Sequence, residues 1–125
     1  MKLFWIALFG LVGVLSRYYL GLWVSRANPL ASFPYGTFLI NLSGSFIIGI
    51  IYALGVERML LPEDLRVGLM VGLMGGYTTF SSFSLEVVRL AETGKYACAG
   101  LYMVGSPVLG AVLALCGIFL VRMAF

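Results

Sequence analysis

A single carboxamide, Asn41, stands inside one of the apolar stretches of this chain. Its two N–H groups are donors that could replace the water around a small, strongly hydrated anion. The same side chain could instead make a hydrogen bond between helices, which contributes about 0.6–2 kcal/mol in membranes. Residue type alone leaves both interpretations open, an anion ligand and a link between helices.

Two phenylalanines, Phe80 and Phe83, are three residues apart and therefore share one face of a helix. An aromatic ring has a positive edge and a negative face, so ring edges could line an anion path without holding the anion tightly. On spacing alone, two rings that face lipid are the simpler interpretation.

Hydroxyl side chains form a further pattern near these residues. Tyr102 and Ser106 are four residues apart, which places two O–H donors on one stripe of a helix, followed by Gly110. Ser81 and Ser84 offer the same chemistry beside the phenylalanines. The pattern fits a polar track for an ion, and it also fits ordinary contact between helices through small residues.

Two ionisable residues, Arg17 and Glu86, lie within or near apolar stretches. A charge at the centre of a bilayer costs at least about 2.5–3.5 kcal/mol, so such residues usually face a water-filled vestibule or a partner. Arg17 lies near the end of its stretch and could also extend to the membrane surface. Glu86 would repel anions unless it is hydrogen-bonded or protonated, and its role stays open.

Composition defines the elements that must position these residues. The chain of 125 residues is 62% hydrophobic and 10% charged, whereas soluble domains carry about 25% charged residues. A soluble domain of this size could not bury so much apolar surface. Four apolar stretches are each long enough to cross a bilayer; they span approximately residues 3–24, 33–56, 65–91 and 96–122. We therefore expect an all-α membrane protein with four transmembrane helices in one domain, residues 1–125, the first stretch being retained rather than cleaved.

The third stretch contains an unusual glycine pattern. Gly68, Gly72 and Gly76 recur every four residues, which permits close approach of another helix. The run 75–79, Gly-Gly-Tyr-Thr-Thr, is poor helix sequence because glycine and β-branched residues both weaken a helix. We expect a break there, near mid-membrane, where unwound carbonyls survive only if they are buried or hydrated.

Basic residues are distributed almost evenly between the two sides that four crossings would create. Lys2, Arg58, Arg66 and Arg122 fall on one side, and Arg26, Arg89 and Lys95 fall on the other. This weak bias specifies orientation poorly. It fits a chain that inserts both ways and pairs antiparallel, and it fits a single orientation as well.

Several classes of function are excluded or disfavoured by what the chain contains. The basic residues are scattered and form no nucleic-acid-binding patch. No histidine is present, no nucleophile is paired with a base, and no metal-ligand cluster or phosphate loop occurs, so we expect no enzyme. Cys98 and Cys116 lie eighteen residues apart in one expected helix, about 27 Å, which is too far for a disulfide.

Three segments resemble the Fluc (CrcB-type) fluoride channel family. Residues 36–46, GTFLINLSGSF, resemble its second-helix signature, and residues 75–86, GGYTTFSSFSLE, resemble its third-helix signature. Residues 10–13, GLVG, together with Arg17, resemble its first-helix pattern, although Phe9 stands where the family often has another glycine.

The resemblance implies an antiparallel homodimer that passes fluoride passively across the bacterial inner membrane through two pores, with one sodium ion at the dimer centre. It implies a vestibule at Arg17 and sodium ligation by the main-chain carbonyls of Gly75 and Thr78. Gly110 stands where another hydroxyl can appear in the family, so the polar track is expected to be shorter here. The pore residues that the resemblance implies are Asn41, Phe80, Phe83, Ser81, Ser84, Tyr102 and Ser106.

Two other membrane functions compete with a fluoride channel. A proton-coupled exporter of the small multidrug resistance type is also a short four-span dimer, but it needs a carboxylate in its first helix, and the first stretch here has Arg17 and no acid. A non-transporting assembly subunit would explain the glycine pattern but not the polar residues at mid-span.

Overall fold

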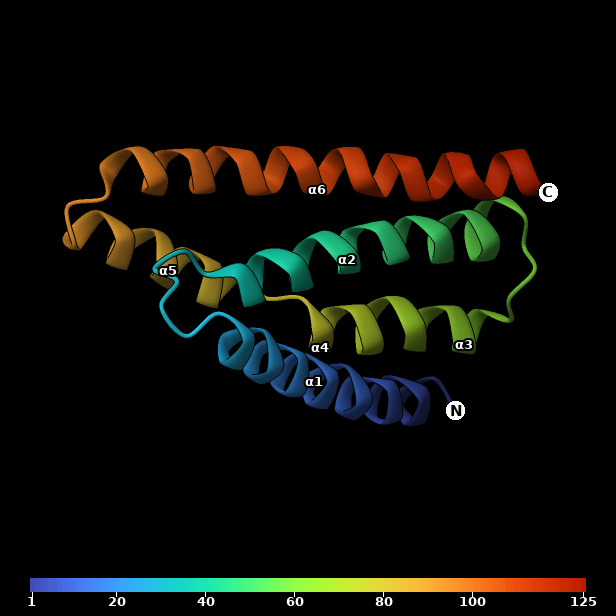
Figure 1. Cartoon of the computed structure of the whole chain (residues 1–125). Helices are drawn as coiled ribbons and strands as arrows, with labels where there is room; N and C mark the ends of the chain where they lie inside the picture. The colour runs from blue at the N-terminus through green and yellow to red at the C-terminus, as the bar shows by residue number, and fades with distance from the viewer.

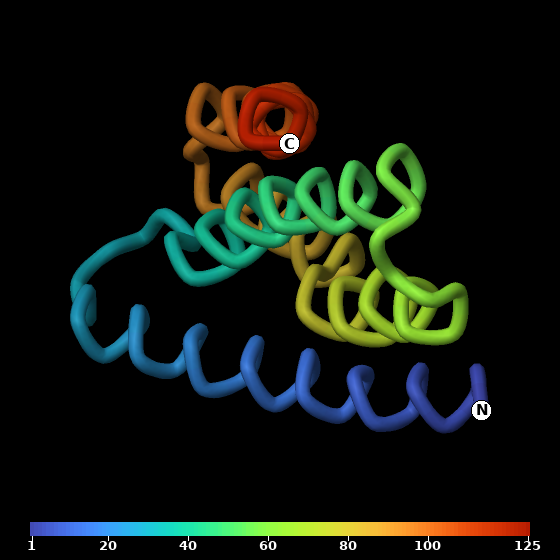
Figure 2. Tube along the Cα trace, turned by 90° about the vertical axis from the view of Figure 1, so that its right-hand side faces the viewer, coloured from blue at the N-terminus to red at the C-terminus, as the bar shows by residue number.

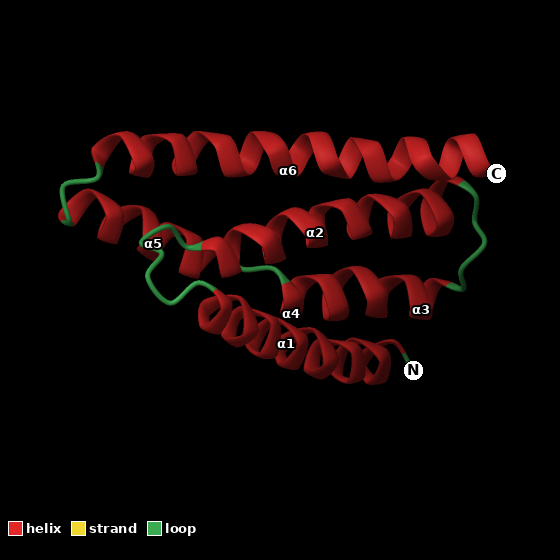
Figure 3. Cartoon of the chain, viewed as in Figure 1, coloured by secondary structure: helices red, strands yellow, loops and turns green.

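The structure is a computed structural model that describes residues 1–125, and it is built from helices without strands (Figure 1, Figure 3). Three helical runs are long and apolar enough to cross a membrane. They are α1 (Lys2–Ala27), α2 (Tyr35–Tyr52) with its π-helical extension η1 (Ala53–Glu57), and α6 (Tyr96–Ala124). The all-helical expectation is confirmed, and the number of crossings that the structure supports directly is three.

The segment between η1 and α6 is helical but interrupted. Its first part is a continuous run of α3 (Glu63–Val67), η2 (Gly68–Met74, π-helical) and α4 (Gly75–Tyr77), and its second part is α5 (Phe80–Glu92). Thr78 and Thr79 between them are extended, with φ/ψ of −83°/159° and −146°/124°. The break expected within residues 75–79 is therefore present, and it falls at the two threonines of that run.

The side chains of the two threonines explain why the break is stable. The Thr78 hydroxyl donates to the Met74 carbonyl at 2.8 Å, which adds a bond at the end of α4. The Thr79 hydroxyl accepts from the Ser82 N–H at 3.3 Å, which caps the first turn of α5. Threonine is a preferred residue at such an N-cap, because its oxygen satisfies a donor that the helix leaves free.

The glycine pattern of the third stretch packs against α1. A Cβ atom on Gly68, Gly72 or Gly76 would lie only 2.6, 2.5 or 2.7 Å from an atom of α1. At Gly72 that atom is the carbonyl oxygen of Ile6, which cannot move aside. Glycine at these positions therefore lets the backbones of α1 and η2–α4 touch, as Figures 1 and 2 show for the blue and yellow-green segments.

The helices stack in layers, with α2 between α6 and the pair formed by α1 and η2–α4 (Figure 1). Only 19 of 125 residues are buried, and large apolar side chains cover the outside of α1 and α6. Such a surface is unsuited to water and must face lipid or another chain. The chain is therefore a multi-pass membrane protein.

Two ion pairs tie the chain ends to the residues on either side of the loop 58–62, Glu57 at the end of η1 and Glu63 at the start of α3. Lys2 Nζ lies 2.7 Å from Glu63 Oε1, and Arg122 Nε donates to Glu57 Oε2 at 2.9 Å. The Lys2 ammonium holds the pKa of Glu63 below its usual value. Because a lowered pKa means a carboxylate stabilised by folding, this contribution is present at neutral pH and is lost as the pH falls through that pKa.

Candidate functional site

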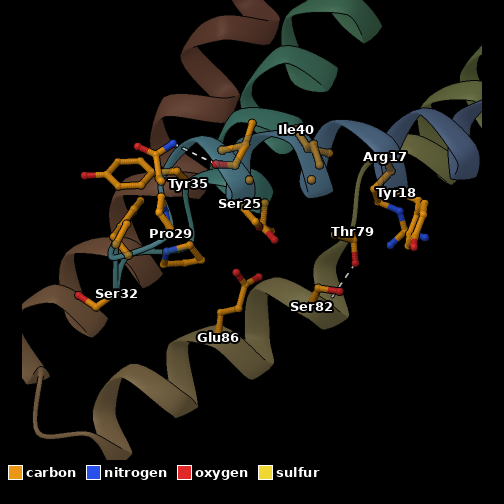
Figure 4. A pocket seen from close by; sticks show the side chains of 18 residues that line it. Arg17, Tyr18, Ser25, Pro29, Ser32, Tyr35, Ile40, Thr79, Ser82 and Glu86 are labelled. Carbon is orange, nitrogen blue, oxygen red and sulfur yellow. Dashed lines mark hydrogen bonds between the residues drawn. The ribbon is translucent and has the colours of Figure 1, made fainter.

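A polar cavity of about 510 Å³ opens between the end of α1, the loop 28–34 and α5 (Figure 4). Arg17 lines this cavity, which we call the vestibule, and no carboxylate lies within salt-bridge distance of it. Glu86 lies across from α1 on the α5 side, and one of its oxygens is buried without a hydrogen-bond partner. The other polar side chains of the wall include Ser25, Asn28, Ser32, Thr37, Thr79 and Ser82.

A second cavity of about 450 Å³, which we call the inner cavity, lies on the other side of the break. Residues from α2, η2, α4, α5 and α6 line it, among them Asn41, Gly75, Thr78, Phe80, Phe83 and Ser106. Thr79 is the one residue that lines both cavities. The extended segment between α4 and α5 is therefore the wall that the vestibule and the inner cavity share.

The Asn41 carboxamide is bound to this shared wall. Its Nδ2 donates to the Thr79 carbonyl at 2.9 Å, and its Oδ1 accepts from the Thr79 N–H at 2.9 Å. A carboxamide has two N–H donors, so one donor remains after this pairing. The link between helices is thus present, and it leaves one N–H for another partner in the inner cavity.

The two phenylalanines of α5 differ in their surroundings. Their ring centroids are 6.1 Å apart, and both line the inner cavity. Phe83 is only 7% exposed and meets the Tyr102 ring edge-to-face at 4.9 Å, whereas Phe80 is 80% exposed. The Phe80 ring therefore reaches the outside of the single chain, where lipid or a partner would cover it.

The hydroxyls expected on α6 are buried. Tyr102 is 2% exposed, and its hydroxyl oxygen has no hydrogen-bond partner. Ser106, which is also buried, lines the inner cavity and a third cavity of about 380 Å³ that Tyr102 shares. α6 therefore brings two hydroxyl side chains beside the inner and third cavities, whose walls are otherwise mostly apolar.

The two serines of α5 are placed differently. Ser81 is exposed and lines neither cavity, and Ser84 donates its hydroxyl to the Phe80 carbonyl at 3.0 Å. The single chain therefore does not bring these serines together with Asn41.

Backbone carbonyls are the cation ligands that the break offers. Nothing donates a hydrogen bond to the Thr78 carbonyl, although Thr78 itself donates twice to Met74. A Cβ built on Gly75 meets nothing within 4 Å, so the backbone is open there. No group of three His, Cys, Asp or Glu side chains occurs that could hold a metal ion. Neutral carbonyl oxygens are hard ligands and suit a hard cation such as sodium.

Sequence reasoning missed three residues of the site, namely Thr37, Ser82 and the peptide group of Thr79. A signal existed for Thr37, because it stands four residues before Asn41 on one face of α2. Nothing in the sequence marked the Thr79 peptide as the partner of Asn41, because every residue carries the same N–H and carbonyl.

The long apolar helices, with a polar cavity and a mostly apolar one between them, define a multi-pass helical membrane protein. Comparison with known families narrows this class. The family described as CrcB-like protein, Camphor Resistance (CrcB), matches residues 4–118, and the chain belongs to this family.

Three relatives illustrate how close the match is. The protein from Syntrophotalea carbinolica is 43% identical over 98% of both chains, and the one from Magnetococcus marinus is 39% identical over 98% of this chain and 99% of its own. The protein from Geobacter metallireducens is 46% identical over 81% of each chain. All three are named "Fluoride-specific ion channel FluC".

Proposed function

We propose that this chain forms a fluoride-selective channel through which fluoride leaves the bacterial cell passively across the inner membrane. The observation that carries the proposal is a polar vestibule that meets, at Thr79, a mostly apolar cavity with a few polar groups, in a chain whose relatives are named fluoride channels. A channel needs no nucleophile or proton-exchanging acid, and α1 contains no acidic residue. This favours a channel over both an enzyme and a proton-coupled exporter.

The vestibule supplies the first step of the proposed path. The Arg17 guanidinium has no paired carboxylate, so its charge favours anions on its own side of the vestibule, away from Glu86, the one carboxylate of the lining. Thr37 and Ser82 add neutral hydroxyl donors to the same wall. Neutral donors replace water around the ion without trapping it as a second full charge would.

The inner cavity supplies the second step. Asn41, with its spare N–H, and Ser106 line it, and Tyr102, whose hydroxyl has no partner, lines the neighbouring third cavity with Ser106. The ring edges of Phe80 and Phe83 offer weak positive contacts between these donors. Several weak sites in series let an ion enter and also leave, which conduction requires. Ser81 and Ser84 join this path only if a second chain completes it.

The fourth crossing and the dimer are also part of the proposal. Residues 65–91 would cross the bilayer as two helical pieces, with Thr78 and Thr79 near its middle. A second, antiparallel chain would cover Phe80 and the open side of the inner cavity, giving two pores per homodimer. The near-even distribution of basic residues supports insertion in both orientations.

A sodium ion at the dimer centre fits the donor set of the break. Main-chain carbonyls of Gly75 and Thr78 from two chains would give four oxygens, and the free Thr78 carbonyl supports this assignment. The ion would neutralise the partial negative charges of converging carbonyls, and its role would be structural.

Reversal potentials in planar bilayers test the function. With a fluoride gradient across a bilayer that contains the purified protein, the current should reverse at the fluoride equilibrium potential. Adding chloride to one side, with fluoride unchanged on both sides, should not move that potential. A reversal potential that follows the chloride gradient would reject fluoride selectivity.

A further inference from the structure

The break between α4 and α5 diverts two backbone donors from the carbonyls that a continuous helix would give them. In an α-helix each N–H donates to the carbonyl four residues earlier, so Thr79 would donate to Gly75 and Ser82 to Thr78. Here the Thr79 N–H donates to Asn41 Oδ1 at 2.9 Å instead. The Ser82 N–H donates to the Thr79 hydroxyl at 3.3 Å.

We infer that the Asn41 carboxamide and the Thr79 hydroxyl are positioning groups that keep the carbonyls of Gly75 and Thr78 free to bind a sodium ion. Each of them takes the donor that would otherwise occupy one of these two carbonyls. The inference rests on the sodium site of the proposed function and adds the side chains that make this site possible.

Asn41 also holds the diverted peptide in place from its other side. Its Nδ2 donates to the Thr79 carbonyl at 2.9 Å, so both halves of the Thr79 main chain are bound to one side chain. A peptide group without a partner is costly at membrane depth. Without Asn41, the lowest-cost partner for the Thr79 N–H is the Gly75 carbonyl, and the sodium ligand is lost.

The Thr79 hydroxyl acts in the same way one turn later. As the N-cap of α5 it satisfies the Ser82 N–H, and the Thr78 carbonyl is left with no donor. Valine has the shape of threonine without the oxygen, and serine keeps the oxygen. These two substitutions therefore separate the hydroxyl from the volume of the side chain.

The test is the sodium dependence of thermal unfolding in the purified full-length protein, without fluoride. Sodium chloride is titrated against N-methylglucamine chloride at constant ionic strength, and the unfolding midpoint is followed. The variants are Asn41→Ala, Thr79→Val and Thr79→Ser. Ser45→Ala is the matched control, because Ser45 lies one turn after Asn41 and bonds only to the Asn41 carbonyl.

The half-maximal sodium concentration should rise roughly tenfold or more in Asn41→Ala and in Thr79→Val. Each variant loses the hydrogen bond that keeps a backbone N–H away from one of the two sodium ligands. It should stay at the wild-type value in Thr79→Ser and Ser45→Ala. Wild-type sodium curves in both Asn41→Ala and Thr79→Val would overturn the inference. If Asn41→Ala does not fold, the comparison of Thr79→Val with Thr79→Ser decides the test.

A wild-type protein whose midpoint ignores sodium would remove the sodium site itself, and the inference with it. That outcome would not count against the proposed fluoride channel, because reversal potentials measure fluoride conduction independently of sodium binding.

Discussion

Phe80 is a residue of the proposed path that packs little against its own chain. Its ring is 80% exposed, whereas Phe83 is packed against Tyr102. The spacing of the two rings was readable from the sequence, but their different exposure was not. It depends on where α6 lies beside α5, and no local pattern encodes that position.

Replacing Phe80 with isoleucine should slow fluoride efflux from liposomes by roughly tenfold, which corresponds to about 1.4 kcal/mol in the barrier. Isoleucine lacks the positive ring edge, and an exposed position should tolerate the change without unfolding. Size-exclusion chromatography checks that assembly is intact. Efflux at the wild-type rate would remove the ring edges from the mechanism.

Replacing Tyr102 with phenylalanine should slow fluoride transport without lowering the stability of the protein. The buried hydroxyl has no partner in the chain, and an unsatisfied buried group costs about 1–3 kcal/mol. The thermal midpoint should therefore stay equal or rise, while fluoride efflux falls several-fold for lack of a donor. A lower midpoint would show that the hydroxyl is structurally bonded, and unchanged efflux would exclude it from the path.

Asn41 illustrates what residue-level reasoning could and could not reach. The sequence pointed to it as a donor inside an apolar stretch and left a link between helices open. The structure shows the link, to a peptide group 38 residues later. Such a partner is set by tertiary packing, so the alternative could not be decided from the residue type.

At the scale of elements, the glycine pattern and the break were both visible in the sequence. Gly68, Gly72 and Gly76 indicated a contact face, and the structure identifies α1 as the helix that meets it. The break lies two to three residues after the Gly-Gly pair, because capping by the threonine hydroxyls fixes it there. The π-helical segments η1 and η2 had no sequence signal.

Gly72→Ala should lower stability by about 1–3 kcal/mol, as overpacked positions do. The new Cβ would lie 2.5 Å from the Ile6 carbonyl oxygen. Gly100→Ala is the matched control, because nothing lies within 4 Å of a Cβ there and alanine favours the helix. Thermal unfolding in detergent measures both. Equal midpoints for the two variants would contradict the close contact between α1 and η2.

At the scale of the whole molecule, composition alone indicated a membrane protein, and the exposed apolar surface agrees with it. The ion pairs at Glu57 and Glu63 tie together the end of the molecule that carries both termini. The antiparallel dimer, which would cover the open side of the inner cavity, depends on contacts between two chains, and the sequence of one chain does not determine those contacts.

Orientation can be measured with a single accessible cysteine. In a chain whose Cys98 and Cys116 are replaced by serine, Glu92→Cys places a thiol at the exposed end of α5. An impermeant thiol reagent added outside intact cells should label about half of the chains if both orientations are equally populated. Labelling of all chains or of none would show a single orientation and exclude the antiparallel dimer.

The central claim is passive, selective movement of fluoride, and efflux from liposomes tests it most directly. Vesicles loaded with potassium fluoride and potassium chloride contain the purified protein, and electrodes follow both anions outside. Because a passive anion path carries charge, fluoride should appear only after valinomycin lets potassium leave, and chloride should stay inside. Fluoride release without valinomycin, or chloride release at a similar rate, would contradict the account.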